Sequence, residues 1–126
     1  MSAARRNIKE RRAAFHWGGR AEFFCLWHLR LKGYRILARR YRTPVGEVDL
    51  IARRGSVLAA IEVKARPDLV TAVEAVGPRQ RQRVTRALAH FLAGRPDLAQ
   101  LAPRFDVMMV TPRSWPRHLI DAWREE

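Results

Sequence analysis

The chain lacks several features that whole classes of protein need. Its 126 residues include one cysteine, Cys25, which excludes an internal disulfide and any zinc or iron–sulfur site built from cysteines. The longest segment without a charged side chain is Ala87–Gly94, far short of the roughly 20 residues that cross a bilayer. The basic N-terminus is followed by no continuous apolar stretch. We therefore expect no membrane span, no secretory signal and a cytoplasmic location.

Acidic side chains are also scarce. Twelve Asp and Glu residues stand against 25 Lys and Arg, which gives a net charge of +13. Residues 1–42 carry +10 of this excess and residues 43–126 only +3. Such a balance favours a polyanionic partner, and we expect nucleic acid. A basic average can also reflect genome composition, because 22 of the 25 basic residues are arginine, as in proteins from GC-rich genomes.

Length and composition predict one globular domain. Apolar residues make up 48% of the chain and charged residues 29%, which is ordinary for a folded protein. The length suffices for one hydrophobic core. Residues 1–18 are rich in arginine and show no apolar periodicity. We expect a flexible basic arm there, followed by a single domain over residues 19–126.

Two segments have the spacing of amphipathic helices. Over residues 19–32 the apolar face comprises Ala21, Cys25, Leu26, Leu29 and Leu31, and Gly33 provides the C-terminal stop. Glu22 shares this inward face, where a carboxylate needs a partner. The second helix is predicted over Pro78–Gly94, with proline at its first position. Its polar side carries a row of arginines: Arg79, Arg83 and Arg86.

The segment between these helices has strand character. The strand-like runs cover residues 34–41, 47–52 and 57–63, with turns at 43–46 and 53–56. Residues 57–61 are apolar at every position, which predicts a central strand covered by helices on both faces.

The remaining segments complete an α/β fold. We expect a loop over residues 66–77 with a helical turn at 72–76, and strands at 105–111 and 118–122 around a turn at 112–116. The predicted architecture has three layers, α/β/α. Its mixed sheet has four to five strands, and its elements follow the order αβββαβ.

Acidic residues and a lysine are predicted to meet on two of these strands. If the loop between them is Arg54-Gly55 or residues 53–56, residue 49 pairs with residue 60. Asp49 then shares a face with Glu62 and Lys64, about 7–8 Å from Glu62 at the backbone, and Glu47 lies opposite Glu62. Acids gathered around one lysine at the end of an apolar strand are unfavourable without a ligand.

This arrangement suits metal-assisted hydrolysis of a phosphodiester. Mg²⁺ (or Mn²⁺) prefers oxygen ligands and is typically held by one or two carboxylates together with substrate phosphate. Asp49, Glu62 and the carbonyl of Val63 would supply these ligands, and Lys64 would orient the attacking water and neutralise the phosphate. The four histidines lack paired metal-ligand spacing, so we expect no zinc site.

Five motifs occur in a characteristic order along the chain. They are Gly19-Arg20-Ala21-Glu22, the run from Gly33 to Arg39, the run from Gly46 to Ala52 that contains Asp49, Glu62-Val63-Lys64, and Arg104-Phe105-Asp106-Val107. In this order the sequence resembles the PD-(D/E)xK nucleases and, within them, the bacterial YraN family. The resemblance implies a restriction-endonuclease-like fold, similar to that of archaeal Holliday-junction resolvases. It also implies Asp49, Glu62 and Lys64 as the catalytic core, with Glu22 as an outer acid that contributes to a metal or a water.

We therefore predict a divalent-metal-dependent DNA endonuclease, with branched or junction DNA as a candidate substrate and a homodimer as a candidate assembly. The candidate nucleic-acid contacts are Arg20, Arg39, Arg79, Arg83 and Arg86. Two alternatives stay open: a non-catalytic nucleic-acid-binding module on the same fold, and a basic adaptor for an acidic protein. We expect Asp106 to bind structural partners. Gln80 could contact the site or DNA, but a solvated helix side chain is the favoured interpretation.

Overall fold

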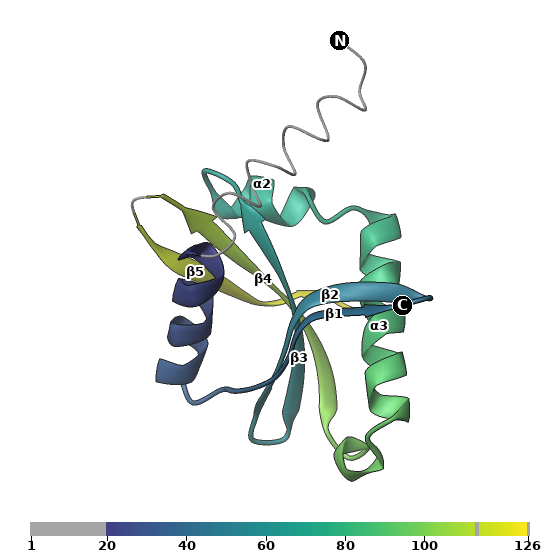
Figure 1. Ribbon diagram of the computed structural model, residues 1–126. Coiled ribbons are helices and arrows are strands. Elements are labelled where there is room, and N and C mark those ends of the chain that lie inside the picture. Colours follow the sequence, from purple (N-terminus) through teal and green to yellow (C-terminus); the bar gives the residue numbers. More distant parts are fainter. Residues whose placement is uncertain (1–19, 113, 126) are drawn as a thin grey trace.

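Three layers make up the protein (Figure 1). The computed structural model describes residues 20–112 and 114–125, so the predicted arm over residues 1–18 lies outside the described residues. A five-stranded sheet lies between a helix, whose described part covers residues 20–31, and the helices α2 (Leu69–Glu74) and α3 (Pro78–Ala93). The α/β/α layering agrees with the prediction.

The strands lie side by side in chain order. They are β1 (Arg35–Thr43), β2 (Gly46–Arg54), β3 (Val57–Ala65), β4 (Ala102–Thr111) and β5 (Ser114–Trp123). β3 and β4 are parallel and the other neighbours are antiparallel, which makes the sheet mixed, as predicted. A parallel pair needs a long crossover. Here it consists of α2, α3 and the short 3₁₀ helix η1 (Pro96–Leu98).

The core consists of two apolar clusters, one on each face of the sheet. In β3, Leu58 and Ala60 belong to the cluster under α3, whereas Ala59 and Ile61 belong to the cluster under the helix over residues 20–31. All four side chains are fully buried. β3 is therefore the central strand that its uninterrupted apolar run predicted.

The helix over residues 20–31 differs from the prediction in one position. Cys25, Leu26 and Leu29 are buried against the sheet, but Leu31 is 73% exposed. Residues two apart on an α-helix are rotated by about 200° about the helix axis and so point to nearly opposite sides, so Leu31 cannot share the face of Leu29. Gly33, with φ of 87°, follows the helix as the predicted stop. None of the helices formed by residues 20–112 and 114–125 has the length and apolar character to span a membrane.

The second half of the chain contains more regular structure than predicted. The expected loop over residues 66–77 includes α2, because the carboxylate of Asp68 accepts a hydrogen bond from the Thr71 N–H at 2.8 Å and caps the helix. β4 begins at Ala102, three residues earlier than expected. Pro116 lies within β5 and not in a turn. An edge strand tolerates proline, since one side of its backbone needs no partner.

The β1–β2 turn brings this hairpin against α3. Thr43 Oγ1 accepts hydrogen bonds from the N–H groups of Val45 and Gly46, in the turn predicted at residues 43–46. A Cβ atom at Gly46 would lie 1.9 Å from the Arg83 carbonyl oxygen. Only glycine allows this approach, which fixes the hairpin beside the helix.

Candidate active site

The sheet divides at Asp49 and Glu62. β2 pairs with β3 only between Arg54–Val57 and Leu50–Ile61. Beyond that point β2 stays paired with β1 as far as Gly46, and β3 stays paired with β4 as far as Ala65. Figure 1 shows the β1–β2 pair bending away from β3 and β4. The candidate site lies where the two halves of the sheet separate.

The predicted register of β2 and β3 was wrong by two residues. Leu50 pairs with Ile61 around the two-residue loop Gly55-Ser56, whereas the prediction paired residue 49 with residue 60. Gly55 has φ of 58°, which suits the first position of such a loop. Because side chains alternate with a period of two, an even shift keeps each side chain on its predicted face.

The same correction moves Glu47 away from its predicted place. It is not opposite Glu62 but pairs with Arg42 of β1. Its carboxylate accepts a hydrogen bond from Arg83 of α3 at 3.3 Å in a solvent-exposed ion pair. Glu47 therefore lies between β1 and α3, beside the acid pair but not part of it.

Backbone N–H groups hold the two acids together. The Val63 N–H donates to Asp49 Oδ2 at 2.8 Å, and the Asp49 N–H donates to Glu62 Oε1 at 3.2 Å. These carboxylates thus accept from N–H groups just past the end of the β2–β3 ladder. Glu62 is only 3% exposed. The structure brings the two predicted acids together, at the point where their strands part.

Gln80, in the first turn of α3, joins Glu62 to Lys64. Its Nε2 donates to Glu62 Oε2 at 2.6 Å, and its Oε1 accepts from Lys64 Nζ at 3.2 Å. Glu62 and Lys64 therefore share the face that looks toward α3. Of the two interpretations of Gln80, the favoured one, a solvated side chain, was wrong, and contact with the site is what the structure shows. A helix that connects parallel strands begins near the end of the first strand. The position of Gln80 in the first turn of such a helix was therefore a sequence signal for a contact with the end of β3.

The acid pair carries more negative charge than its surroundings neutralise. Burial, and next the charge of Asp49, raise the pKa of Glu62 to about 8. Burial also raises the pKa of Asp49, although the Val63 N–H and the charge of Lys64 oppose that rise. At neutral pH the pair consequently retains a proton unless another cation is present.

Glu22 lies on the other side of the site, on the helix over residues 20–31. Its carboxylate accepts hydrogen bonds from Arg39 Nε at 2.8 Å and Arg40 Nη2 at 3.1 Å. Burial, followed by the charges of Asp49 and Glu22, raises the pKa of Cys25 to about 12. Cys25 is fully buried and behaves as the small apolar residue that its helix face predicted. The charges of Glu22 and Asp49 thus both act on the Cys25 thiol.

Arg40 is a site neighbour that the sequence did not indicate. It lies in β1 with φ of 49°, in the left-handed region that few non-glycine residues adopt. Its guanidinium binds Glu22, and its charge is one of the influences that lower the pKa of Asp49. No residue pattern marks a strand position that will take this conformation.

The candidate nucleic-acid contacts divide into two groups. Arg20, Arg79 and Arg86 are exposed, whereas Arg39 is bound to Glu22 and Arg83 to Glu47. Solvent-exposed ion pairs contribute little to stability, so an incoming phosphate can compete for both bound arginines.

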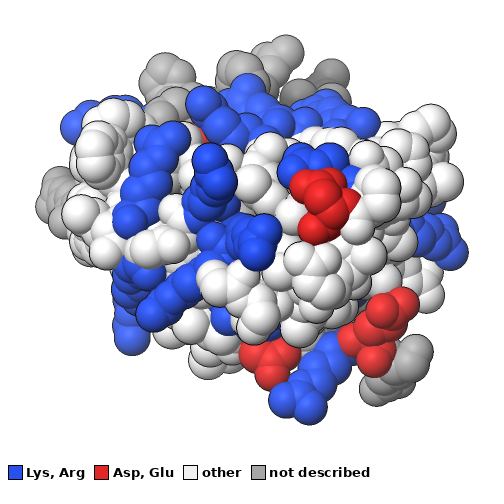
Figure 2. Space-filling model, turned by 90° about the horizontal axis from the view of Figure 1, so that it is seen from below, with Lys and Arg blue, Asp and Glu red and all other residues white. Residues whose placement is uncertain are grey.

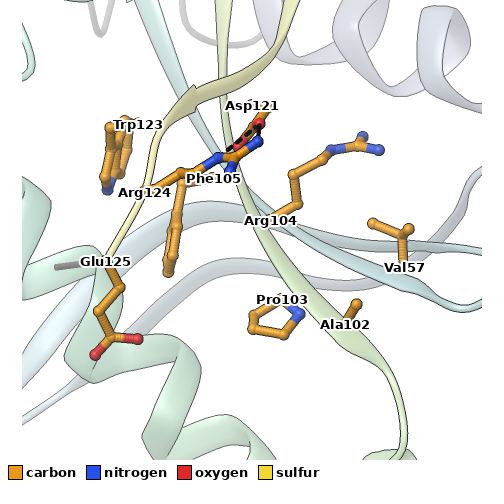
Figure 3. Close-up of a pocket in the computed structure, with 9 residues that line it drawn as sticks. All are labelled: Val57, Ala102, Pro103, Arg104, Phe105, Asp121, Trp123, Arg124 and Glu125. Atoms are coloured by element: carbon orange, nitrogen blue, oxygen red, sulfur yellow. Dashed lines mark hydrogen bonds and ion pairs between the residues drawn. The ribbon is translucent and has the colours of Figure 1, made fainter.

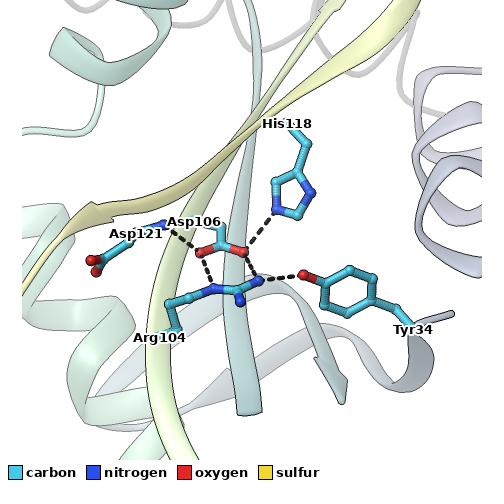
Figure 4. Close-up of polar contacts among 5 residues, drawn as sticks. All are labelled: Tyr34, Arg104, Asp106, His118 and Asp121. Carbon is cyan, nitrogen blue, oxygen red and sulfur yellow. Dashed lines mark hydrogen bonds and ion pairs between the residues drawn. The ribbon is translucent and has the colours of Figure 1, made fainter. Parts of the chain in front are cut away.

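Asp106 has structural partners, as expected (Figure 4). It is fully buried and accepts hydrogen bonds from Arg104 Nε and Nη2 at 2.9 and 2.8 Å and from the Asp121 N–H at 2.9 Å. His118 Nε2 lies 2.8 Å from its second oxygen, and Arg104 also donates to the Tyr34 hydroxyl. Burial would raise the pKa of Asp106, but the bonds from His118 and Arg104 lower it overall.

A pocket of about 390 Å³ lies away from the acid pair (Figure 3). Its lining includes Val57 and Ala102, at the start of β3 and β4, and the stacked rings of Phe105 and Trp123. Asp49 and Glu62 do not line it. The pocket therefore belongs to the opposite end of the sheet.

The donor set at the site fits magnesium. Within residues 20–112 and 114–125, no group of three or more His, Cys, Asp and Glu residues could hold a metal ion. Mg²⁺ needs fewer, since one or two carboxylates with waters and substrate oxygens suffice. Glu62 is buried and Asp49 part-buried, and burial is the largest cause of the raised pKa values of both carboxylates, which the charge of Lys64 opposes. Oxygen donors of this kind suit Mg²⁺ or Mn²⁺ and not zinc.

The fold belongs to a known structural class. The chain is similar to the Archaeoglobus fulgidus protein Hjc, a Holliday junction resolvase from an archaeal hyperthermophile, with a TM-score of 0.51 and 22% sequence identity. The similarity covers 80% of this chain and 73% of that chain. The fold is thus restriction-endonuclease-like, as the sequence resemblance implied.

Closer relatives identify the family. The model of the uncharacterised protein family UPF0102 matches residues 21–110, and the chain belongs to this family, also called the YraN family. A UPF0102 protein of Parvibaculum lavamentivorans is 55% identical over 112 residues, which cover 89% of this chain and 84% of the relative. One from Bradyrhizobium diazoefficiens is 51% identical over 114 residues, covering 90% and 86%. The resemblance found in the motifs is confirmed.

Proposed function

We propose that the protein is a divalent-cation-dependent endonuclease that hydrolyses phosphodiester bonds in branched or junction DNA. The observation that carries this proposal is the pair of acids at the division of the sheet, buried Glu62 and part-buried Asp49, both with raised pKa values. Lys64 is linked to Glu62 by Gln80, which hydrogen-bonds to both side chains. A site that is short of positive charge and flanked by a lysine suits a cation and a phosphate together.

Asp49 and Glu62, with the Val63 carbonyl, would hold Mg²⁺ or Mn²⁺. Such an ion, when bound, lowers the pKa of a water and stabilises charge on the phosphate. Glu62 loses its proton as the cation binds, because a ligand carboxylate must be ionised. Lys64 orients the attacking water and neutralises the phosphate with its ammonium group. Gln80 holds Glu62 and Lys64 in place, and Glu22 acts as an outer acid, positioned by Arg39 and Arg40.

DNA as the substrate is supported by charge and by fold. The net charge is +13, and Arg79 and Arg86 are exposed on α3, whose first turn adjoins the site. The similar fold of a Holliday junction resolvase supports a branched DNA as the form bound. Phosphate contacts from these arginines would place the backbone without reading sequence.

The proposal includes a homodimer, since two copies related by two-fold symmetry would present two sites to a symmetric junction. An exposed aromatic patch supports it: the ring of Phe24 lies 5.6 Å from that of Phe23 and 5.7 Å from that of Trp115. Sedimentation equilibrium tests the dimer, and a monomer at every concentration would remove this part of the proposal.

Cleavage of a panel of DNAs tests the proposed function. Single-stranded, duplex, flap and four-way-junction DNAs would be incubated with Mg²⁺ or Mn²⁺ and with wild type, Glu62→Ala or the control Glu74→Gln, which alters an exposed acid of α2. We expect the wild type and the control to cleave, and Glu62→Ala to be inactive. DNA binding without cleavage by any of the three would favour the non-catalytic module instead.

A further inference from the structure

Basic side chains gather at the end of the sheet that lies away from the acid pair. We call Lys32, Arg35, Arg53 and Arg54 the hairpin patch, because three of them belong to β1 and to the β2 arm of the β2–β3 hairpin, and Lys32 follows the helix over residues 20–31. Figure 2 looks onto this end of the molecule and shows Lys and Arg side chains gathered on one side of the face.

The hairpin patch is not neutralised by its surroundings. Arg35 and Arg53 lie directly opposite each other in the β1–β2 ladder, an arrangement that is unfavourable for like charges. Within the described residues, none of the four patch side chains forms an ion pair with an acid. Arg53 Nε donates to the Gly55 carbonyl, and the Arg54 guanidinium lies 5.6 Å from the centre of the Tyr34 ring.

Asp97 is an acid on which the charge of the hairpin patch acts, but it is already bound to another arginine. Its carboxylate accepts two hydrogen bonds from Arg95, each of 3.0 Å. These bonds, and to a smaller extent the charge of Arg53, lower the pKa of Asp97. A bound acid of this kind leaves the positive charge of the hairpin patch available to another partner.

The hairpin patch is separate from the candidate active site. Arg54 lies five residues after Asp49 along β2, which corresponds to about 17 Å along an extended strand. In Figure 1 the β2–β3 turn lies at the bottom of the sheet, below the point where the β1–β2 pair separates from β3 and β4. The hairpin patch therefore lies at the turn end of β2, and the candidate active site lies past the other end of the β2–β3 ladder.

We propose that the hairpin patch binds the phosphate backbone of a second duplex segment, so that one molecule holds two duplex segments at once. The planar guanidinium groups of Arg35, Arg53 and Arg54 match phosphate oxygens. The β2–β3 turn exposes no large apolar side chain, whereas the centre of a protein–protein interface is usually apolar. This inference goes beyond the proposed function, because it concerns a surface outside the cleavage site and needs no metal.

Binding measurements in EDTA test the hairpin patch without cleavage. The double variant Arg53→Gln/Arg54→Gln would be compared with the wild type and with the control Arg117→Gln/Arg124→Gln, which removes the same charge from exposed positions on and after β5. Affinity for a four-way junction would be followed by fluorescence anisotropy over a series of salt concentrations. Thermal melting would verify that all three proteins are folded.

We expect the hairpin patch variant to lose about tenfold or more in junction affinity, and its plot of log affinity against log salt to be less steep by about 2. The control should stay close to the wild type. Equal affinity and slope in both variants would overturn the proposal. Patch-dependent binding of a polyglutamate peptide, with DNA affinity unchanged, would also overturn it and assign the surface to an acidic protein. Patch-dependent DNA binding by a protein that never cleaves would leave this inference standing and contradict only the proposed nuclease.

Discussion

Two buried acidic sites on the same sheet have opposite electrostatic character. Asp106 accepts hydrogen bonds from Arg104 and the Asp121 N–H and contacts His118, and these partners lower its pKa despite burial. Glu62 is about as deeply buried, but the charge that acts on it most strongly is that of another acid, Asp49, and its pKa is raised to about 8. One site is complete within the protein, and the other is short of positive charge.

The difference separates an acid whose partners lie within the fold from an acid that, in the proposed function, binds a cation. Burial alone does not distinguish Asp106 from Glu62. What distinguishes them is the source of the compensating charge: the protein supplies it to Asp106, and a cation from solution would supply it to Glu62 and Asp49. Perturbed carboxylates of the second kind mark functional sites.

Removal of the Glu62 charge should have the largest effect on cleavage. We expect Glu62→Gln to lower the cleavage rate by about 1,000-fold, because the cation loses a ligand and the water loses its activation. The fold should persist, since the amide has the shape of the carboxyl group. Single-turnover cleavage of a junction DNA measures the effect, with Glu74→Gln as the control. A matching rate loss in folded Asp106→Asn would abolish the distinction between the two sites.

Removal of the Asp106 charge should instead affect stability. We expect Asp106→Asn to lower the free energy of unfolding by about 3–5 kcal/mol, because Arg104 and His118 would lose a buried partner. Urea denaturation measures this loss. Asp97→Asn is the matched control: it breaks a solvent-exposed pair with Arg95 and should lower the free energy of unfolding far less than Asp106→Asn does. Equal losses in the two variants would contradict the structural role of Asp106.

The raised pKa of Glu62 predicts how stability depends on pH. Between about pH 4.5 and 8 the unfolded chain has lost the Glu62 proton while the metal-free folded protein keeps it. The contribution of Glu62 to the free energy of unfolding is therefore fully present below pH 4.5 and is lost as pH rises toward 8, by at most about 1.4 kcal/mol per pH unit. Asp49 acts in the same direction. Urea titrations in EDTA measure the slope.

Glu62→Gln provides the comparison for that slope, because it removes the titrating group. The free energy of unfolding of the variant should therefore fall less steeply with pH over this range than that of the wild type. Parallel curves for the wild type and Glu62→Gln would show that Glu62 does not retain its proton in the folded protein.

The smallest of the predicted effects concerns Gln80. We expect Gln80→Ala to lower the cleavage rate about tenfold, because Glu62 and Lys64 would lose the amide that positions them. Gln82→Ala, at an exposed position of the same helix, is the control and should leave the rate unchanged. A larger loss in DNA affinity than in cleavage rate would indicate that Gln80 contacts the substrate and does not position the acids.

The sequence was sufficient to predict where the acids meet, although the predicted strand register was wrong. The two-residue error left Asp49 and Glu62 together, because the alternation of side chains along a strand repeats every two residues. The central strand was predictable since an uninterrupted apolar run over residues 57–61 needs cover on both faces.

Features that depend on tertiary contacts were not predicted. Gln80 is polar in a polar helix turn, and only the packing of α3 against the end of β3 gives it two site partners. The conformation of Arg40 and the cap of α2 by Asp68 likewise arise from local geometry that apolar periodicity does not report. Leu31 was wrongly assigned to the buried face because the predicted apolar face of the helix included too wide an arc.

Calorimetric titration of Mn²⁺ and Mg²⁺ tests the central claim most directly, because it asks whether the Asp49–Glu62 pair takes its missing charge from a cation. The account predicts saturable binding to the wild type at neutral pH, with release of a proton that varies with the buffer, and loss of this binding in Asp49→Asn and Glu62→Gln. Asp97→Asn should bind as the wild type does. Unchanged binding in Glu62→Gln, or no binding to the wild type even with junction DNA present, would contradict the account.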